Sequence, residues 1–358
     1  MGEEVRLLHP HVGLSGGRGK MAERVRIAFI GCGANSRGHI RSVMSIPEAE
    51  VVAICDVNPA AMNDITDKIP GAASLPCFSD YRVMIDTIKP DGVVISIPHA
   101  LHEETVAHAL AAGVHVEVEK PMVVNAEQAR RLIELRDRYR RVLLVGYQRH
   151  YLGPYRWVRD VLSSGLYGPI HFIECWLAQD WKGAGWRSVR ALSGGGELAD
   201  SGSHLVDAVF WMSGLVPEEV FALIDCRGRE VDVLSAITFR CEGGALGTMA
   251  IVGEHPIRMD EGMHFWCRDA CITVEGSVWG ARQPRVTVQR KGEDPQAVLP
   301  EDMKAFPGSK DQNFVRAIQG GEEVQAPAEC GLVAALFTDA VYASVDAGQP
   351  VRVQASTR

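Results

Sequence analysis

The sequence predicts a two-domain α/β protein, in which a doubly wound parallel sheet is followed by an α/β domain with a mostly antiparallel sheet. The 358 residues are enough for about two domains. Up to Gly146, short β-branched runs alternate with helical stretches, which is typical of a parallel sheet covered on both faces. After Gly146, strand candidates follow one another in series, which indicates antiparallel pairing. We therefore expect a first domain over 21–146 and a second over 147–358.

Residues 1–20 contain five glycines and no apolar periodicity. We expect them to form a flexible extension. Ordered alternation begins directly after Met21, so Met21 is a candidate for the natural start of the chain.

The first domain is expected to alternate strands and helices in βαβ units. The predicted strands are Val25–Ile30, Val51–Cys55, Gly92–Ile97, Val114–Val118 and Val142–Val145. The predicted helices are Arg37–Met44, Pro59–Lys68, Tyr81–Ile88, His102–Ala112 and Ala126–Tyr139.

The second domain is expected to form a large, open sheet packed on helices over Tyr155–Ser163 and Leu198–Trp211. Its predicted strands are Ile170–Leu177, Val220–Ile224, Val233–Phe239, Ala245–Ile251, His264–Val274 and Arg285–Gln289. A last predicted helix, over Cys330–Ala347, could pack on either domain.

Composition narrows the class of protein. Hydrophobic residues make up 46% and charged residues 23%, which is typical of globular proteins and excludes a disordered chain. The net charge of −8 has the wrong sign for a protein that neutralises nucleic-acid phosphates. No apolar run approaches the roughly 18 residues of a membrane span, and 1–20 has no hydrophobic region of a signal peptide. We expect a soluble, cytoplasmic protein.

The nine cysteines include no CxxC pair. The nearest two, Cys267 and Cys271, fall in one strand-like stretch, where residues four apart lie too far from each other to share a metal. Reduced thiols and no metal site are the expectation.

A glycine-rich turn follows the first predicted strand and opens a helix, with Gly31, Gly33 and Gly38 in GCGANSRGHI. The first glycine permits a tight turn, and the second lets backbone N–H groups approach a pyrophosphate at the helix N-terminus. Ser36 takes the third position of a strict GxGxxG and is small enough for close packing. This context predicts a dinucleotide site.

Asp56 ends the second predicted strand, where its carboxylate can accept hydrogen bonds from adenosine ribose hydroxyls. It would repel a 2′-phosphate, and Val57 and Asn58 supply no cation to neutralise one. NAD is therefore favoured over NADP. A turn-forming Asp before Asn58-Pro59 is the structural alternative for Asp56 alone.

Lys120 closes the strand VHVEV, at a carboxyl strand end where doubly wound folds bind ligands. Its three donors could hold substrate hydroxyls or stabilise a developing alkoxide. A surface lysine at a strand end is the alternative.

The segment SGGGELADSGSHLVDAVFWM carries Asp200, His204 and Asp207 after a triple glycine. If it is helical from Glu197 onward, Asp200 and His204 are i and i+4 and share one face, with Asp207 one turn further. The carboxylate would orient the imidazole and raise its pKa, so that the ring takes a proton from a substrate hydroxyl near neutral pH. Glycines 194–196 would leave the approach to this face open. A structural histidine is the alternative.

Further candidates lie near the proposed cleft. His102 follows another strand end and is expected to line the nicotinamide side. Connections near the domain junction supply an aromatic and cationic lining that would suit a hydroxylated ring, although interdomain packing explains them equally well: Arg149, Tyr151, Trp181, Trp186 and Arg187.

With these motifs in place, the chain resembles the glucose-fructose oxidoreductase / inositol dehydrogenase (Gfo/Idh/MocA) family from about Val25 to the C-terminus. The motifs that carry the resemblance are GCGANSRGHI, CDVNP, SIPHALH, VEVEKPM and GGGELADSGSHLVD followed by WMSG. The resemblance implies a Rossmann domain, a C-terminal α/β domain whose large open sheet mediates homodimers or homotetramers, and pyridine-nucleotide-dependent redox chemistry on a sugar, inositol or related polyol. Ser36 and His99 depart from the residues usual in the family, Gly or Ala and Asn respectively.

The expected site follows from both lines of reasoning. The EKP lysine and the acid and histidine that complete the family's catalytic set correspond to Lys120, Asp200 and His204. Cofactor contacts are expected from Gly31, Gly33, Ala34, Asn35, Ser36, Asp56, Pro98, His102, Glu119 and Lys120, and substrate contacts from Lys120, Arg149, Trp181, Trp186, Arg187, Asp200 and His204. Two alternatives stay open, a redox-neutral NAD-dependent glycosidase and a non-catalytic ligand sensor.

Overall fold

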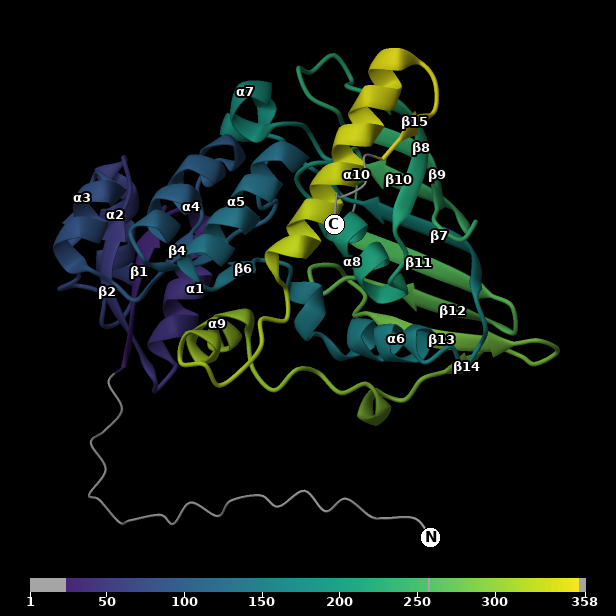
Figure 1. The fold of residues 1–358 in the computed structure, drawn as a ribbon, viewed down its shortest axis with the longest axis horizontal. Coiled ribbons are helices and arrows are strands. Elements are labelled where there is room, and N and C mark those ends of the chain that lie inside the picture. Colours follow the sequence, from purple (N-terminus) through teal and green to yellow (C-terminus); the bar gives the residue numbers. More distant parts are fainter. Residues whose placement is uncertain (1–23, 257, 354–358) are drawn as a thin grey trace, which may run out of the picture.

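The computed structural model describes residues 24–256 and 258–353, so the expectations for 1–20 and Met21 lie outside the described residues. Two sheets organise the chain, one in each half (Figure 1). The first is parallel, with six strands in the order β3-β2-β1-β4-β5-β6. The second has nine strands and is mostly antiparallel, in the order β14-β13-β12-β11-β7-β10-β9-β8-β15. The predicted fold class is confirmed.

The first sheet is buried on both faces, because helices cover both sides of its short apolar strands. Its strands are β1 (Val25–Ile30), β2 (Ala49–Cys55), β3 (Cys77–Phe78), β4 (Gly92–Ile95), β5 (His115–Val118) and β6 (Leu143–Val145). The connecting helices are α1 (Ala34–Met44), α2 (Pro59–Lys68), α3 (Tyr81–Ile88), α4 (His102–Ala111) and α5 (Ala126–Tyr139).

The second sheet is buried on one face, so its strands alternate buried and exposed residues, as in the pattern of β9. The long strands are β7 (Ile170–Ala178), β8 (Pro217–Asp225), β9 (Leu234–Cys241), β10 (Leu246–Val252), β11 (Asp260–Cys267), β12 (Ala270–Glu275) and β13 (Arg285–Arg290), with short β14 (Gln296–Ala297) and β15 (Val351–Arg352) at the edges. The helices α6 (Gly153–Ser163), α8 (Gly202–Ser213) and α10 (Ala328–Ala347) lie on the buried side (Figure 1).

One predicted strand is wrong. His264–Val274 is not continuous, because the chain turns at Arg268 and Asp269 and β11 pairs antiparallel with β12. Cys267 and Cys271 therefore lie on neighbouring strands, not four residues apart along one strand. All nine cysteines are free.

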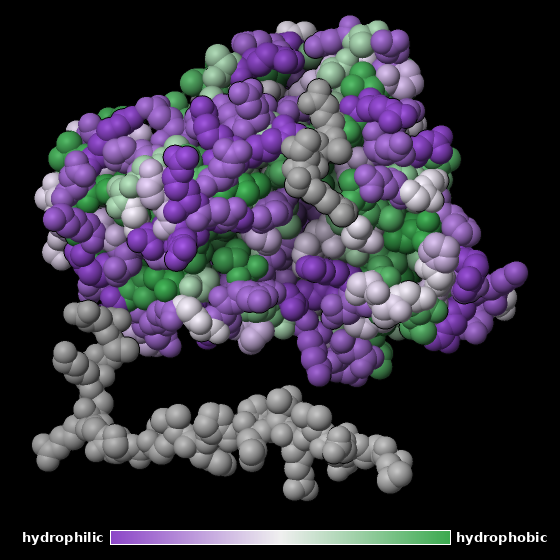
Figure 2. Space-filling view, viewed as in Figure 1, coloured by the Kyte–Doolittle hydropathy of each residue, from purple (hydrophilic) through white to green (hydrophobic). Residues whose placement is uncertain are grey.

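The C-terminal segment connects the two halves. Helix α9 (Lys310–Ile318) packs on α1 and β5 of the first sheet, and α10 packs on α5, α8 and β8. The sequence left the position of α10 open, and the helix contacts both halves. Of the described helices, only α10 has the length and composition to cross a membrane, and 61% of its most apolar window is buried inside the protein. Hydrophilic residues are spread over most of the surface seen in Figure 2.

Candidate active site

The glycine turn between β1 and α1 presents bare backbone to a cavity of about 520 Å³. Gly31 has φ +93°, and a Cβ there would overlap the carbonyl of Ser96. Gly33 is the N-cap of α1 and has open space around it, and no side chain caps the helix. The first N–H groups of α1 are thus available for an anion.

Asp56 lines the same cavity from the end of β2. Its Oδ1 accepts a hydrogen bond from Asn58 N (2.8 Å), which is the turn role that the sequence left open, and its Oδ2 accepts one from Cys32 N (2.7 Å). The cavity is also lined by predicted cofactor-binding residues, namely Gly31, Gly33, Ala34, Asn35, Pro98, Glu119 and Lys120.

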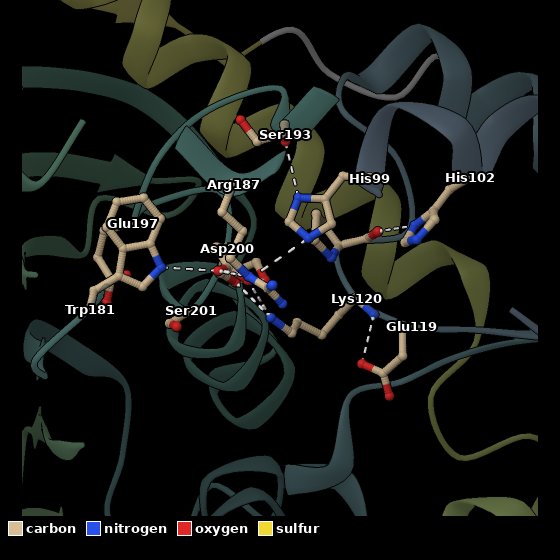
Figure 3. A network of polar contacts seen from close by, with 12 residues as sticks. His99, His102, Glu119, Lys120, Trp181, Arg187, Ser193, Glu197, Asp200 and Ser201 are labelled. Carbon is tan, nitrogen blue, oxygen red and sulfur yellow. Dashed lines mark hydrogen bonds and ion pairs between the residues drawn. The ribbon is translucent and has the colours of Figure 1, made fainter. Parts of the chain in front are cut away.

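Two predicted cofactor-binding residues do not line this cavity. Ser36 is fully buried, and its hydroxyl donates to the carbonyl oxygen of Gly31 (2.6 Å). It therefore stabilises the glycine turn from inside the protein. His102 is also fully buried, with ring nitrogens 2.9 Å from Pro121 O and 3.0 Å from Ile97 O. Its ring packs edge-on against the ring of His99 (centroids 5.8 Å apart) and has no contact with Asp200 in Figure 3.

A larger cavity of about 1010 Å³ adjoins the first, and Lys120, Asp200 and His204 all line it. Both cavities share the lining residues Asn35, Glu119, Lys120 and Arg187. Lys120 follows β5 of the first sheet, whereas His204 lies in α8, which packs on the second sheet. The predicted catalytic residues therefore meet where the two halves of the chain face each other.

Asp200 is the centre of the hydrogen-bond network in Figure 3. Its carboxylate accepts hydrogen bonds from Lys120 Nζ (2.9 Å), Trp181 Nε1 (3.0 Å) and Arg187 Nε (2.9 Å), and His99 Nε2 lies 3.8 Å away. Burial alone would raise the pKa of Asp200, but Lys120, His99 and Arg187 outweigh it and hold the pKa well below its usual range. Asp200 is therefore a carboxylate at any physiological pH.

The predicted pairing of Asp200 with His204 is wrong. Helix α8 begins at Gly202, so Asp200 precedes it, and the two residues are not on one helical face. Asp207 lies one turn beyond His204 in α8, as predicted, but its carboxylate is buried against His150 Nε2 (2.9 Å) and lines neither cavity.

His204 is held by aromatic neighbours instead of an acid. Trp279 stacks on its ring (centroids 5.6 Å apart), and Tyr147 packs edge-on (6.1 Å). Its Nδ1 is buried without a hydrogen-bond partner among the described residues. Burial first, then the charges of Arg149 and Lys120, keep the pKa of His204 well below its usual value, not raised as predicted. The imidazole is neutral at pH 7 and can accept a proton.

Glycines 194–196 pack tightly and line neither cavity, contrary to the expectation of an open approach. A Cβ at Gly195 would overlap the hydroxyl of Tyr342, and one at Gly196 would overlap the carbonyl of Asp232. The Asp232 carboxylate accepts from the N–H groups of Gly196 (2.7 Å) and Leu198 (2.8 Å). The glycines let this buried acid hold the segment before α8.

Arg149 is not a cavity residue either. It is 1% exposed, and its guanidinium donates to the carboxylate of Glu261, to which Tyr155 also donates. Tyr151 also lies outside both cavities, with its hydroxyl donating to Asn313 Oδ1 (3.0 Å). The other three candidates from the domain junction do face a cavity. Trp181 lines the larger one, Trp186 the smaller and Arg187 both.

Several cavity residues were not predicted from the sequence. The larger cavity is also lined by Gln148, Gln179, Lys182, Trp279, Lys310 and Asp311. Lys310 and Asp311 come from α9, whose start carries a detectable signal, since Ser309 and Gln312 form a capping box.

Comparisons with known proteins agree with this architecture. Residues 25–147 match the model of the GFO/IDH/MocA oxidoreductase family with an NAD-binding Rossmann fold. Residues 155–273 match the model of the GFO/IDH/MocA C-terminal domain. One match falls in each half of the fold.

Curated relatives include dehydrogenases and a catabolic protein. The chain is 30% identical over 194 residues to the rhizopine catabolism protein MocA of Rhizobium meliloti, a match over 54% of this chain and 59% of that protein. It is 25% identical over 350 residues to inositol 2-dehydrogenase of Streptomyces avermitilis, over 94% of this chain and 97% of the relative. The match to MocA thus spans little more than half of that relative's length.

Among solved structures, GenD2 from gentamicin A biosynthesis in complex with NAD superposes with a TM-score of 0.80. It is 20% identical and covers 96% of this chain and 100% of its own, a likeness that shows the fold alone. Together, the two family matches and the site geometry show that the chain belongs to the Gfo/Idh/MocA family of NAD-binding oxidoreductases.

Proposed function

We propose that the protein is an NAD-preferring dehydrogenase that oxidises or reduces one CH–OH carbon of a sugar, inositol or related polyol. The observation that carries this proposal is that Lys120, Asp200 and His204 line one cavity directly beside the cavity of the glycine turn. The name of the inositol 2-dehydrogenase relative supports the substrate class.

The residues present fit a dinucleotide. The free N–H groups at the start of α1 would hold the pyrophosphate, and Asp56 would accept hydrogen bonds from the ribose hydroxyls. Asp56 would repel a 2′-phosphate, and Val57 beside it carries no charge, which favours NAD over NADP. When bound, NAD+ supplies the hydride acceptor for the reaction.

His204 is the proposed base, because its imidazole is neutral and faces the cavity. It would take the proton of the substrate hydroxyl as the carbon is oxidised. The Lys120 ammonium would stabilise the developing alkoxide. Asp200 would act as a positioning residue, because it holds Lys120 by two contacts, through Oδ1 (2.9 Å) and its backbone carbonyl (3.2 Å).

The larger cavity suits a polyhydroxylated substrate. Its lining mixes amide, carboxylate and ammonium groups that can pair with hydroxyls, including Gln148, Gln179, Asp180 and Lys182. The Oε1 of Gln148 is buried without a hydrogen-bond partner among the described residues, so it is free to accept from a ligand hydroxyl.

The proposal includes a cytoplasmic homodimer or homotetramer formed through the open face of the second sheet. Outward positions there carry apolar side chains, including Leu223 (66% exposed) and Trp266 (36%). Light scattering coupled to size-exclusion chromatography measures the oligomeric state. A monomer at micromolar concentration would contradict this part of the proposal.

Product analysis tests the reaction type. The purified protein is incubated with NAD+ and a panel of polyols, and the products are identified by mass spectrometry. The proposal predicts a carbonyl product that is lighter than the substrate by two hydrogen atoms and forms in step with NADH. Cleavage of a chromogenic glycoside with no net NADH would instead identify a redox-neutral glycosidase.

A further inference from the structure

A cluster of five titratable side chains, which we call the His39 cluster, lies beside the proposed catalytic residues. The cluster draws on three elements that are far apart in the sequence. His39 belongs to α1, Glu117 belongs to β5, and Glu119 directly follows β5. Lys310 and Asp311 belong to α9. Its side chains are at most 14% exposed. It is not part of the predicted catalytic set.

Four members of the cluster pair with one another. His39 Nδ1 lies 2.5 Å from Asp311 Oδ1, and His39 Nε2 lies 2.9 Å from Glu119 Oε1. Lys310 Nζ donates to the same Glu119 oxygen (2.5 Å). Burial and Lys310 lower the pKa of His39, but its hydrogen bonds to Asp311 and Glu119 outweigh them and raise the pKa to about 10. His39 is therefore an imidazolium between two carboxylates.

Glu117 is the member of the cluster without a hydrogen bond in the part of the chain that the structure describes. It is fully buried, and neither of its carboxylate oxygens has a hydrogen-bond partner among the described residues. The two cations that face it are beyond hydrogen-bond distance, because His39 Nδ1 lies 3.6 Å and Lys310 Nζ 3.9 Å from Glu117 Oε1. Asp311, Glu119 and the hydroxyl of Tyr151 are the other titratable groups around it.

Counting charges shows what the cluster lacks. Three carboxylates face two cations, so one positive charge is missing when all five groups are ionised. Burial, followed by the charge of Asp311, raises the pKa of Glu117 to about 8. A proton on Glu117 balances the cluster.

The cluster borders the place where a nicotinamide would lie, if the proposed function holds. His39, Glu119, Lys310 and Asp311 line the larger cavity. A dinucleotide whose adenosine end is held by Asp56 extends toward Lys120, the residue directly after Glu119. The oxidised nicotinamide ring carries a positive charge that the reduced ring lacks. That charge favours the ionised form of a nearby carboxyl.

We propose that Glu117 carries an exchangeable proton that the protein releases more readily with NAD+ bound than with NADH bound. The His39 cluster thereby links the redox state of the cofactor to pH. As pH rises through the titration of Glu117, its negative charge builds up and favours the positively charged ring. The ratio Kd(NAD+)/Kd(NADH) therefore falls with rising pH, by about tenfold for each unit by which the ring charge shifts the pKa of Glu117.

The test measures binding, not turnover. Isothermal titration of both nucleotides into the full-length protein, in buffers of different ionisation enthalpy at pH 8, gives the protons exchanged on binding. The expected result is that the NADH complex holds more protons than the NAD+ complex. Equal proton numbers for the two nucleotides in the wild-type protein would overturn the inference, whether or not any variant folds.

Variants assign the proton to the cluster. Glu117→Gln keeps the shape and removes the ionisation, so the ratio of dissociation constants should become flat between pH 6 and 9.5. Asp339→Asn is the matched control, because Asp339 is a half-buried acid with a raised pKa that lies outside both cavities. It should leave the pH dependence unchanged.

The outcomes separate the two proposals. If neither nucleotide binds, the proposed function itself fails. If both bind and Glu117→Gln keeps the wild-type pH dependence, only the role of Glu117 fails. Stoichiometric metal in the wild-type protein that is lost in Glu117→Gln would also overturn it, because a metal ion would then supply the missing charge.

Discussion

Asp200 and His204 lie in the same cavity wall, and the pKa of each is lowered, which leaves Asp200 charged and His204 neutral. Cations around Asp200 keep it ionised, whereas burial and two nearby cations keep His204 neutral. One residue therefore fixes the Lys120 ammonium, and the other is free to accept a proton. This division separates the alkoxide-stabilising group from the base before any substrate enters.

His204→Ala should remove most turnover and leave the cofactor site intact. The proposed base contributes on the order of 10²- to 10⁴-fold to the rate. We expect kcat to fall by that factor, while the Kd for NAD measured by fluorescence stays within twofold, because His204 does not line the nucleotide cavity. A variant that keeps near-wild-type kcat would refute the assignment of His204.

The acid side of the pH profile should report the lowered pKa of His204. A base works only when neutral, so lowering its pKa preserves activity as pH falls through its usual value of about 6.5. We expect kcat/KM to decline only below that pH. A decline centred above pH 7 would contradict the neutral-base mechanism.

Arg149 provides the matched test of this electrostatic effect. Its charge helps lower the pKa of His204, and its partner is the buried Glu261. The paired substitution Arg149→Met with Glu261→Gln removes both charges without leaving either alone. The decline of kcat/KM on the acid side of the pH profile should then shift to higher pH. If its midpoint stays at the wild-type pH, this role of Arg149 is excluded.

For individual residues, the sequence predicted correctly which proposed catalytic side chains line one cavity, but it did not predict their hydrogen-bond partners. Lys120, Asp200 and His204 do share a cavity. Their spacing suggested an Asp200–His204 pair because an i, i+4 relation assumes a continuous helix. The helix begins only at Gly202, and three donors distant in the sequence compete for Asp200.

Among the elements, the segment before α8 depends on close packing of backbone. Asp232 accepts hydrogen bonds from Gly196 N, Leu198 N and the hydroxyl of Tyr342. This buried acid therefore fixes the chain just before Asp200. The triple glycine is needed because its neighbours leave no room for side chains.

Gly196→Ala should destabilise the protein. The new Cβ would overlap the carbonyl of Asp232, and relief of such overpacking typically costs about 1–3 kcal/mol. Urea denaturation measures the loss. Gly38→Ala is the control, since nothing lies near a Cβ at Gly38, and it should be neutral or slightly stabilising. Equal stability of both variants would contradict the packing role.

Element prediction succeeded where periodicity was local. Strand β1 and helices α2, α3 and α5 match their predicted ranges, and the other long strands and helices differ at their ends. Helix α9 was missed, although its capping box was present, because its short apolar face packs on α1 and β5 rather than on a neighbour in sequence. The three acids and the lysine beside His39 could not be grouped without that contact.

Across the whole molecule, the proposed cofactor-binding and catalytic residues are divided between the two sheets, and only their packing brings these residues together. The first sheet provides the glycine turn, Asp56 and Lys120, and the second supports the helix that carries His204. This arrangement follows from the change in strand pattern near Gly146, which the sequence showed. The full lining of the larger cavity did not follow, because Trp181, Trp279 and the start of α9 come to it from distant parts of the chain.

The most direct test of this account is the absorbance at 340 nm of the purified protein with NAD or NADP across inositols, aldoses, uronates and anhydrosugars. The account predicts steady NADH formation with at least one polyol, a clear preference for NAD, and loss of the signal in His204→Ala. Bound NAD with no absorbance change on any of these substrates would contradict a dehydrogenase and favour a redox-neutral or non-catalytic relative.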